Sequence, residues 1–308
     1  MINFRYHIVS LMAVFLALSV GIVLGVTFGA PVNAGITTQA EADRRQVQEL
    51  RAELDRRNVL DKYRDAWATS AGQPLTNGVL GGQRVALVAM PDAPAAVVNT
   101  LTTAVTDAGG TVTSTAKVNA NAFDPAKVEL LTSALEPYGD ALGLAPTMSD
   151  ATRLGTALGR AVAAKQAGDA EPVVEQVRKS LRSASLADID DEAGGQAQLL
   201  IVVTAEAADT PPTTEVLQAR LDAEVALTTQ AAGVVLAGPN SEGVEGTDVL
   251  AARNDSAAVR ALSTVDVADV ASGVTTVVLA GKERLLGRAG HYGALTKAES
   301  PMPALPVR

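Results

Sequence analysis

The pattern of hydrophobic and polar positions changes several times along the chain, and its first segment, residues 8–30, contains no charged residue. As an α-helix, these residues would extend about 34 Å, slightly more than the hydrocarbon core of a membrane at about 30 Å. A single transmembrane helix is therefore predicted. Arg5 precedes it and the first charge after it is Glu41, so we expect residues 1–7 to be cytoplasmic and the remainder extracytoplasmic.

A cleaved signal peptide is the alternative for this segment, because Val32-Asn33-Ala34 resembles a small-residue cleavage site. The apolar region of a signal peptide is normally only about 7–15 residues long, which favours a retained anchor. Within the segment, Gly21, Gly25 and Gly29 recur every four residues and lie on one helix face. Such a stripe lets two membrane helices approach closely and predicts dimerisation. The alternative is that glycine is simply common in membrane helices.

Residues 31–71 are expected to form a short coiled-coil stalk. Acidic and basic residues are interspersed between 41 and 65, while apolar residues recur at alternating four- and three-residue steps. The apolar positions of this seam are Ile36, Ala40, Val47, Leu50 and Leu54, and an offset apolar set after Arg57 consists of Leu60, Tyr63 and Trp67. We therefore predict a parallel homodimer. A solvated helix without a specific partner is the alternative.

A glycine-rich stretch at 72–83 is predicted to be a linker, after which the pattern becomes that of a Rossmann-like, mostly parallel α/β domain at 84–289. Strands are expected at 84–90, 111–118, 199–204, 233–237 and 263–265. Helices are expected at 94–108, 126–135, 149–167, 172–185, 213–230, 247–253, 256–262 and within 269–288. The three helices between 126 and 185 indicate an insertion or cap. Residues 290–308 lack periodicity and are expected to form a flexible tail.

Composition narrows the class of function. A chain of 308 residues with 47% hydrophobic content can bury a sizeable core. The net charge of −9 argues against nucleic acid as a partner. There is no cysteine, so an extracytoplasmic domain would be held together without disulfides, and no thiolate is present for metal or redox chemistry.

Candidate catalytic motifs are weak, and we expect the protein not to be an enzyme. No glycine-rich phosphate-binding motif follows a predicted strand, and the turn after the first strand, residues 91–94, contains no glycine. The two histidines, His7 and His291, show no metal-binding or triad spacing. We therefore predict no resident cofactor.

The sequence offers few metal ligands. The acidic run of Asp188, Asp190, Asp191 and Glu192 could hold a hard cation, although a solvated loop is the favoured interpretation. A copper site would need converging Cys, Met or His side chains, and the five methionines are scattered along the chain.

Both ends of the chain resemble a known family. The opening FRYHIVSLMAVFLALSVGIVLG, from Phe4 to Gly25, and the GRAGHYG sequence at 287–293 are similar to those of the actinobacterial copper transport protein B family, MctB. The order of anchor, coiled coil and α/β domain also resembles the family. The resemblance implies copper transport or copper resistance at the cell envelope, in some descriptions as an outer-membrane channel. Through the related envelope protein SteB, it also implies cell division and regulation of peptidoglycan hydrolases. It supplies no ligand residues, so copper enters only through the resemblance.

These observations predict a non-enzymatic protein of the cell envelope, anchored in the cytoplasmic membrane by one span and dimeric through its anchor and stalk. Its α/β domain would bind an envelope protein or stabilise the dimer. A copper carrier or channel component is the alternative, but one membrane helix cannot enclose a pore, and the sequence lacks the alternating strands of a barrel.

Overall fold

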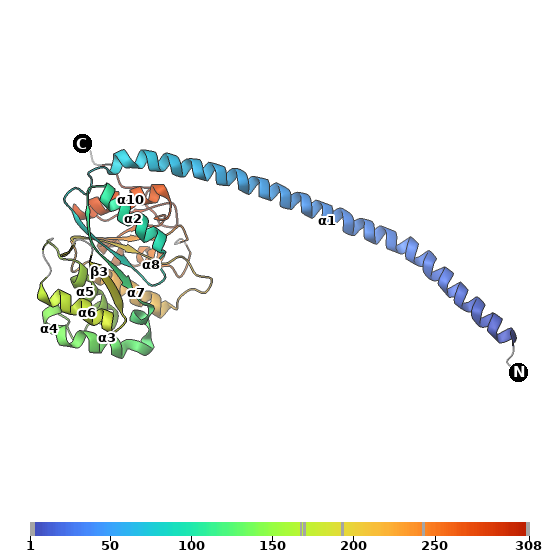
Figure 1. Cartoon of the computed structure of the whole chain (residues 1–308), viewed down its shortest axis with the longest axis horizontal. Coiled ribbons are helices and arrows are strands. Elements are labelled where there is room, and N and C mark those ends of the chain that lie inside the picture. Colours follow the sequence, from blue (N-terminus) through green and yellow to red (C-terminus); the bar gives the residue numbers. More distant parts are fainter. Residues whose placement is uncertain (1–3, 167, 169–170, 192–193, 242–243, 306–308) are drawn as a thin grey trace. The chain divides into compact units, whose positions relative to one another are not determined.

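The computed structural model describes the backbone of residues 4–166, 168, 171–191, 194–241 and 244–305, and their side chains except at 4, 5, 28–41 and 191. The chain divides into two compact units, Met1–Arg64 and Asp65–Arg308. The first unit contains most of helix α1 (Phe4–Thr76), and the second contains the end of α1 and an α/β domain (Figure 1).

Helix α1 is continuous through the predicted anchor and stalk. Its segment Tyr6–Thr27 has a mean hydropathy of 2.6 and is long and apolar enough to cross a membrane. The helix does not stop at the predicted linker, because it continues to Thr76. Gly72 is buried against Thr275, with no space for a Cβ, so tertiary packing holds the helix through the glycine. The turns that follow include Gly78 and Gly82, both with positive φ.

The α/β unit is built on one seven-stranded sheet, in which every neighbouring pair is parallel except β2 and β3. The order across the sheet is β3 (Ala187–Asp191), β2 (Thr111–Val118), β1 (Arg84–Ala89), β4 (Leu199–Val203), β5 (Gly233–Ala237), β6 (Ser263–Val265) and β7 (His291–Tyr292). The central strands β4 and β5 are buried along their whole length, as expected for parallel strands covered on both faces.

Helices cover both faces of this sheet (Figure 1). One face packs on α2 (Ala95–Asp107) and α10 (Ala271–Leu285). The other packs on α3 (Val128–Leu135), α5 (Asp150–Val162), α6 (Pro172–Ser183), α7 (Thr214–Leu227) and α8 (Asp248–Asn254). Shorter segments are α4 (Gly139–Leu142), α9 (Ala258–Ala261) and the 3-10 turns Ala120–Phe123, Pro125–Lys127 and Glu136–Tyr138. The predicted mostly parallel α/β class is thus confirmed.

Local sequence signals account for most of these elements. The predicted strands at 111–118, 233–237 and 263–265 are confirmed residue for residue as β2, β5 and β6. Ser149 and Thr213 cap α5 and α7, each accepting a backbone N–H three residues on. Helix α5 ends at Val162, earlier than predicted, because Ala163 is extended and forms a β-bridge with Ala197.

Two edge strands were not predicted. β3 lies in the acidic run that we interpreted as a solvated loop, where Ala187 and Ile189 are buried and Asp188 and Asp190 are exposed. Buried and exposed residues alternate along β3 with the period of a strand. Because the exposed residues are carboxylates, the segment contains no apolar run of the kind from which the other strands were predicted. The chain reaches this edge after Ser185, which has a φ of 55°.

The second unpredicted strand corrects the expectation of a flexible tail from residue 290. β7 pairs in parallel with β6, and both of its side chains are buried. The chain then returns alongside it, where Gly293 donates a backbone hydrogen bond to Ser300. A strand of two residues is too short for any periodicity in sequence, so its position depends on tertiary contacts.

Candidate functional site

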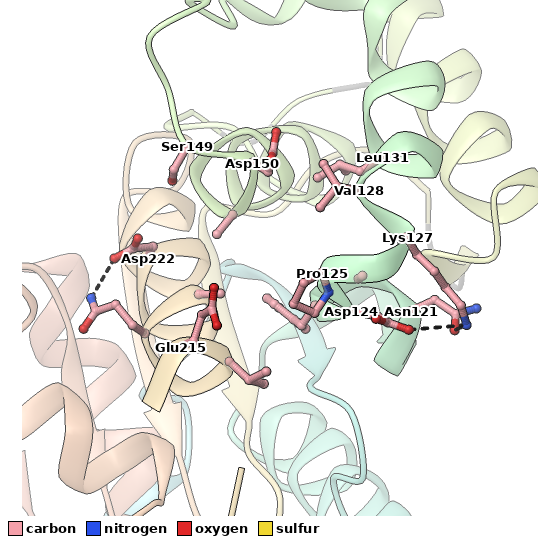
Figure 2. Close-up of a pocket in the computed structure, with 16 residues that line it drawn as sticks. Asn121, Asp124, Pro125, Lys127, Val128, Leu131, Ser149, Asp150, Glu215 and Asp222 are labelled. Atoms are coloured by element: carbon pink, nitrogen blue, oxygen red, sulfur yellow. Dashed lines mark hydrogen bonds and ion pairs between the residues drawn. The ribbon is translucent and has the colours of Figure 1, made fainter. Parts of the chain in front are cut away.

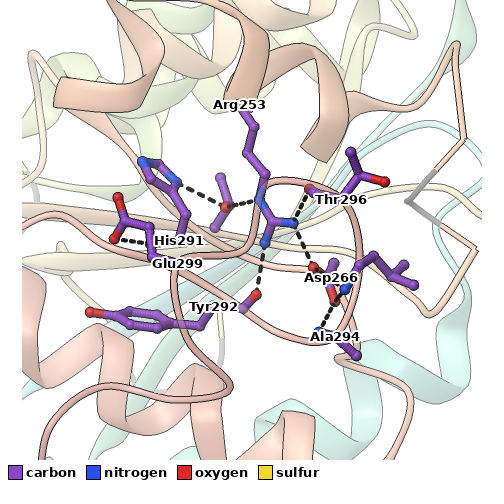
Figure 3. Close-up of polar contacts among 9 residues, drawn as sticks. Arg253, Asp266, His291, Tyr292, Ala294, Thr296 and Glu299 are labelled. Carbon is purple, nitrogen blue, oxygen red and sulfur yellow. Dashed lines mark hydrogen bonds and ion pairs between the residues drawn. The ribbon is translucent and has the colours of Figure 1, made fainter.

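The C-terminal strand is held by a buried network centred on Arg253 (Figure 3). From α8, Arg253 donates to Thr264 Oγ1 at 2.9 Å, to Asp266 Oδ2 at 2.5 Å and to the Tyr292 carbonyl at 2.7 Å. The Arg253 and Asp266 side chains are 2% and 0% exposed. Asp266 also accepts backbone N–H bonds from Ala294 at 2.9 Å and from Leu295. One guanidinium therefore joins α8, β6 and β7.

His291 is part of this network and has both ring nitrogens engaged. Nδ1 lies 3.0 Å from Thr264 Oγ1, and Nε2 lies 3.2 Å from the Val259 carbonyl. Because a carbonyl can only accept, Nε2 carries the proton and Nδ1 accepts from the threonine hydroxyl. Burial lowers the pKa of His291, partly opposed by the Val259 carbonyl and the charge of Glu299. The geometry therefore fits a neutral, structural imidazole.

Tyr292 and Gly293 complete the strand's contacts. The Tyr292 hydroxyl donates to Glu283 in α10, and burial, together with this carboxylate, raises the pKa of the phenol. Gly293 has a φ of 135°, and a Cβ there would collide with the Asp266 carboxylate. The GHYG sequence is thus explained by packing around Asp266 and Glu283.

The soft side chains that could bind copper are the histidines and methionines. His291 could bind a metal only by giving up its bond to Thr264 or Val259. Met90 is buried and Met302 half-buried. Within the part of the chain that the structure describes, no three His, Cys, Asp or Glu side chains gather to hold a metal ion.

The acidic run is explained by its surroundings. Asp188 pairs with Arg182, whose Nε lies 2.6 Å from Asp188 Oδ1. Arg182 also donates to the Ile189 carbonyl at 2.6 Å. Asp190 belongs to the exposed side of β3, while Glu192 lies outside the described residues. The solvated interpretation therefore fits better than a cation site.

The predicted dimerisation residues all lie on α1. A Cβ at Gly21 or Gly25 would meet nothing within 4 Å, and the side-chain position of Gly29 lies outside the described set. The other predicted residues, Val47, Leu50, Leu54, Leu60, Tyr63 and Trp67, are between 45% and 67% exposed. The structure thus places these apolar side chains on a helix and leaves them open to a partner.

Trp67 also lines a groove of about 370 Å³ in the α/β unit. The end of α1 contributes Trp67, Ala71 and Leu75, and the opposite wall includes Val270 and Met302. This lining is mostly apolar. Trp67, one of the predicted set, therefore belongs to a pocket of the α/β unit.

A nucleotide site is poorly supported by the first turn of the sheet. The strand order reverses between β1 and β4, where doubly wound sheets usually bind ligands. The turn after β1 leads through Asp92 and Pro94 into α2, and Pro94 has no N–H for a phosphate. This agrees with the missing glycine motif in the sequence.

Sequence reasoning missed Arg253 and Asp266. Both were within or beside predicted elements, but a charged residue in a short helix is ordinarily solvated. In the sequence, only the GHYG motif at 290–293 indicated that the C-terminal region has a fixed structure.

Comparisons with known proteins agree on one family and cover nearly the whole chain. A sequence profile described as "Copper transport outer membrane protein, MctB" matches residues 1–303. The protein named copper transporter MctB in Mycobacterium tuberculosis is 30% identical over 316 residues, which cover 95% of this chain and 96% of that protein. Its counterpart in Mycobacterium bovis has the same values, and that in Mycobacterium leprae is 29% identical over 310 residues.

Proposed function

The chain belongs to the MctB copper transport family, and we propose that it acts in the cell envelope as a membrane-anchored, non-enzymatic interaction protein. In this proposal α1 crosses the cytoplasmic membrane with its N-terminus inside, and the α/β unit lies outside. Copper transport is the process that the names of its relatives indicate. The envelope partner would be of the kind that the SteB resemblance implies, which acts in cell division and peptidoglycan hydrolase regulation.

The observation that carries the proposal is the exposed apolar seam of α1. Val47, Leu50 and Leu54 are each about half exposed and follow the three- and four-residue steps of a coiled coil. Full burial of such a side chain contributes roughly 1.5–3 kcal/mol, so a second helix covering the seam would gain several kcal/mol. Gly21 and Gly25 are open on the same helix, which supports a parallel homodimer.

The absence of cysteine makes this proposal directly testable. A Leu50→Cys variant of the full chain in membranes should form a disulfide-linked dimer on mild oxidation, because equivalent seam positions face each other in a parallel coiled coil. Val59→Cys is the matched control, since Val59 is also exposed but lies about opposite Leu50 around the helix. Equal cross-linking of both variants, or of neither, would contradict the stalk dimer.

A second variant tests the seam itself. Adding Leu54→Asn to Leu50→Cys should strongly reduce cross-linking, while adding Val59→Asn should leave it unchanged. Trp67 provides an independent readout, because it is the only tryptophan and is exposed in one chain. Its quenching by acrylamide should decrease when the dimer forms, if the offset apolar set is also covered.

A copper carrier or channel component is the second candidate, favoured by the name of the relatives. One span cannot enclose a pore, so a copper channel would need an oligomer or another protein. Equilibrium dialysis of the full chain in detergent distinguishes the two. The interaction proposal expects no stoichiometric binding of Cu⁺ or Cu²⁺, and micromolar or tighter binding would overturn it in favour of a carrier.

A further inference from the structure

A second groove lies on the face of the sheet that packs on α3, α5 and α7, opposite α10. Figure 2 shows the residues that line it. Its volume is about 410 Å³, within the range of roughly 300–1,000 Å³ that is usual for ligand pockets. It is bounded by residues 121–131, by the start of α5 at 149–151 and by residues 215–222 of α7. We call it the α5–α7 groove.

The floor of the α5–α7 groove is apolar. Phe123 and Leu131 are buried and belong to the core of this face, and Val216 and Ala219 are half-buried against the same core. Val128, at the beginning of α3, remains 36% exposed. The floor is therefore continuous with the core but still offers apolar surface to a ligand.

The rim of the groove is acidic. Its lining includes the carboxylates Asp124, Asp150, Glu215 and Asp222 and one basic residue, Lys127. Lys127 is already engaged, because its Nζ donates to Asn121 Oδ1 at 2.5 Å and lies 3.7 Å from Asp124 (Figure 2). Among the described residues, no lysine or arginine forms an ion pair with Asp150, Glu215 or Asp222.

Stabilisation of the helix N-termini explains why some of these acidic residues are present, but not why they surround one groove. Asp150 and Glu215 lie in the first turns of α5 and α7, where a carboxylate stabilises the helix dipole. Asp222 lies beyond the first turn of α7 and accepts a hydrogen bond from Gln218 at 2.9 Å. Capping would not require these carboxylates to surround a shared apolar groove.

We propose that the α5–α7 groove binds a basic, partly apolar peptide segment of a protein partner. An arginine or lysine of the segment would lie against Asp150, Glu215 and Asp222, and a neighbouring large apolar side chain would cover Val128 and Ala219. Charge complementarity selects this occupant, because an acidic or neutral segment would leave the carboxylates unpaired. The inference rests on the proposed function in one respect, that the α/β unit recognises another protein.

The test measures binding of short labelled peptides to the full chain in detergent by fluorescence anisotropy. The probe is Gly-Leu-Arg-Phe-Lys-Gly, amidated and labelled with fluorescein. Three comparison peptides carry citrulline and norleucine in place of Arg and Lys, Glu in place of both, or Ser in place of Leu and Phe. We expect saturable binding of the basic apolar peptide with Kd below about 100 µM, and at least about tenfold weaker binding of the others.

Variants then locate the site. Glu215→Gln with Asp222→Asn should weaken binding about five- to tenfold, since two exposed charge pairs with the peptide would be lost. Ala219→Phe should fill the floor and abolish binding. Glu129→Gln with Glu136→Gln is the matched control, because both residues are exposed helix-start carboxylates outside the groove. An unchanged urea midpoint for the charge variant would show that it remains folded.

The inference would be overturned by equal binding of the four peptides, or by equal weakening of binding in the groove and control variants. Equal affinity for free arginine amide would also overturn it, because the groove would then recognise a small cation and not a peptide. The stalk test remains separate. Leu50→Asn with Leu54→Asn should abolish the dimer but leave peptide binding intact, so failure of one proposal does not imply failure of the other.

Discussion

Helix α1 exposes apolar side chains, whereas the C-terminal network buries charged and polar ones. Along α1, the apolar side chains of Val47 to Trp67 are about half exposed or more. Around β7, the charged and polar side chains of Arg253, Asp266 and His291 are buried. Each arrangement is costly for an isolated helix or an isolated strand, because apolar surface favours burial and a buried charge needs a partner.

The difference lies in where each region finds its partners. Arg253 and Asp266 satisfy each other and several backbone groups within the chain. On α1, Val47, Leu50 and Leu54 remain about half exposed. In the proposed dimer they would be covered by a second chain. We therefore expect substitutions around β7 to change folding stability and substitutions on α1 to change association.

The largest expected effect breaks the internal network. Arg253→Ala leaves the buried Asp266 carboxylate without its cation and should lower the free energy of unfolding by about 3–5 kcal/mol. Urea denaturation of the full chain in detergent, followed by far-ultraviolet circular dichroism, measures this loss. Arg288→Ala is the control, since Arg288 is an exposed partner of Glu283 and should cost at most about 1 kcal/mol. Equal losses of unfolding free energy in the two variants would mean that burial of the Arg253–Asp266 pair adds nothing to its contribution to stability.

A somewhat smaller effect concerns the glycine beside this network. Gly293→Ala should cost about 2–3 kcal/mol, because its Cβ would collide with Asp266 at a backbone conformation that favours glycine. Gly287→Ala matches it in having a positive φ, but a Cβ there meets nothing within 4 Å. The difference between the two variants in urea denaturation isolates the collision. No difference would contradict the close approach of strand and carboxylate.

The pH dependence should be smaller again. Burial lowers the pKa of His291 in the folded state, whereas the unfolded chain has the ordinary value of about 6.5. The unfolded state therefore binds the proton more readily, and stability should fall as pH decreases below about 6.5, by up to about 1.4 kcal/mol per pH unit, until the folded-state pKa is reached.

Urea denaturation at about pH 7.5 and 5.5 measures this slope, with His291→Gln as the control that removes the titration. Asp248 acts in the opposite sense, because burial raises its pKa against the attraction of Arg220, so its contribution is lost as pH rises. This contribution is common to both proteins and cancels in the comparison. Equal slopes for the two proteins would show that His291 is not held neutral by the fold.

The smallest expected effect lies on α1. Arg57 and Glu53 form an exposed ion pair one turn apart, with Nη2 and Oε1 separated by 2.5 Å. Glu53→Gln should change stability by only about 0.3–0.5 kcal/mol and should not alter the cross-linking of Leu50→Cys. A large loss of cross-linking would place this pair inside the dimer interface and change the assignment of the seam.

Most of the fold could be predicted from periodicity. The buried parallel strands are predicted by short apolar runs such as 233–237. The start of α5 is predicted by Ser149, which is a favourable capping residue. Neither edge strand contains such an apolar run. β3 alternates carboxylates with buried residues, and β7 has only two residues. Both are defined by the strand beside them and not by their own composition.

The candidate sites were less predictable for the same physical reason. The seam of α1 repeats along one helix, so spacing alone predicts that Leu50 and Leu54 share one face of it. The Arg253 network and the α5–α7 groove join residues far apart in sequence, and the spacing within any one segment does not contain them. A carboxylate such as Asp222 looks like any solvated helix residue until the facing helix is known.

The late position of β7 has a consequence for how the protein is made. Synthesis runs from the N-terminus, so Arg253 and Asp266 emerge before the carbonyl of Tyr292 and the amides of Ala294 and Leu295 that complete their shell. A chain interrupted before residue 291 would leave β6 as the edge of the sheet, and Arg253 and Asp266 without these backbone partners. The network is thus completed only when the last strand of the sheet has been added.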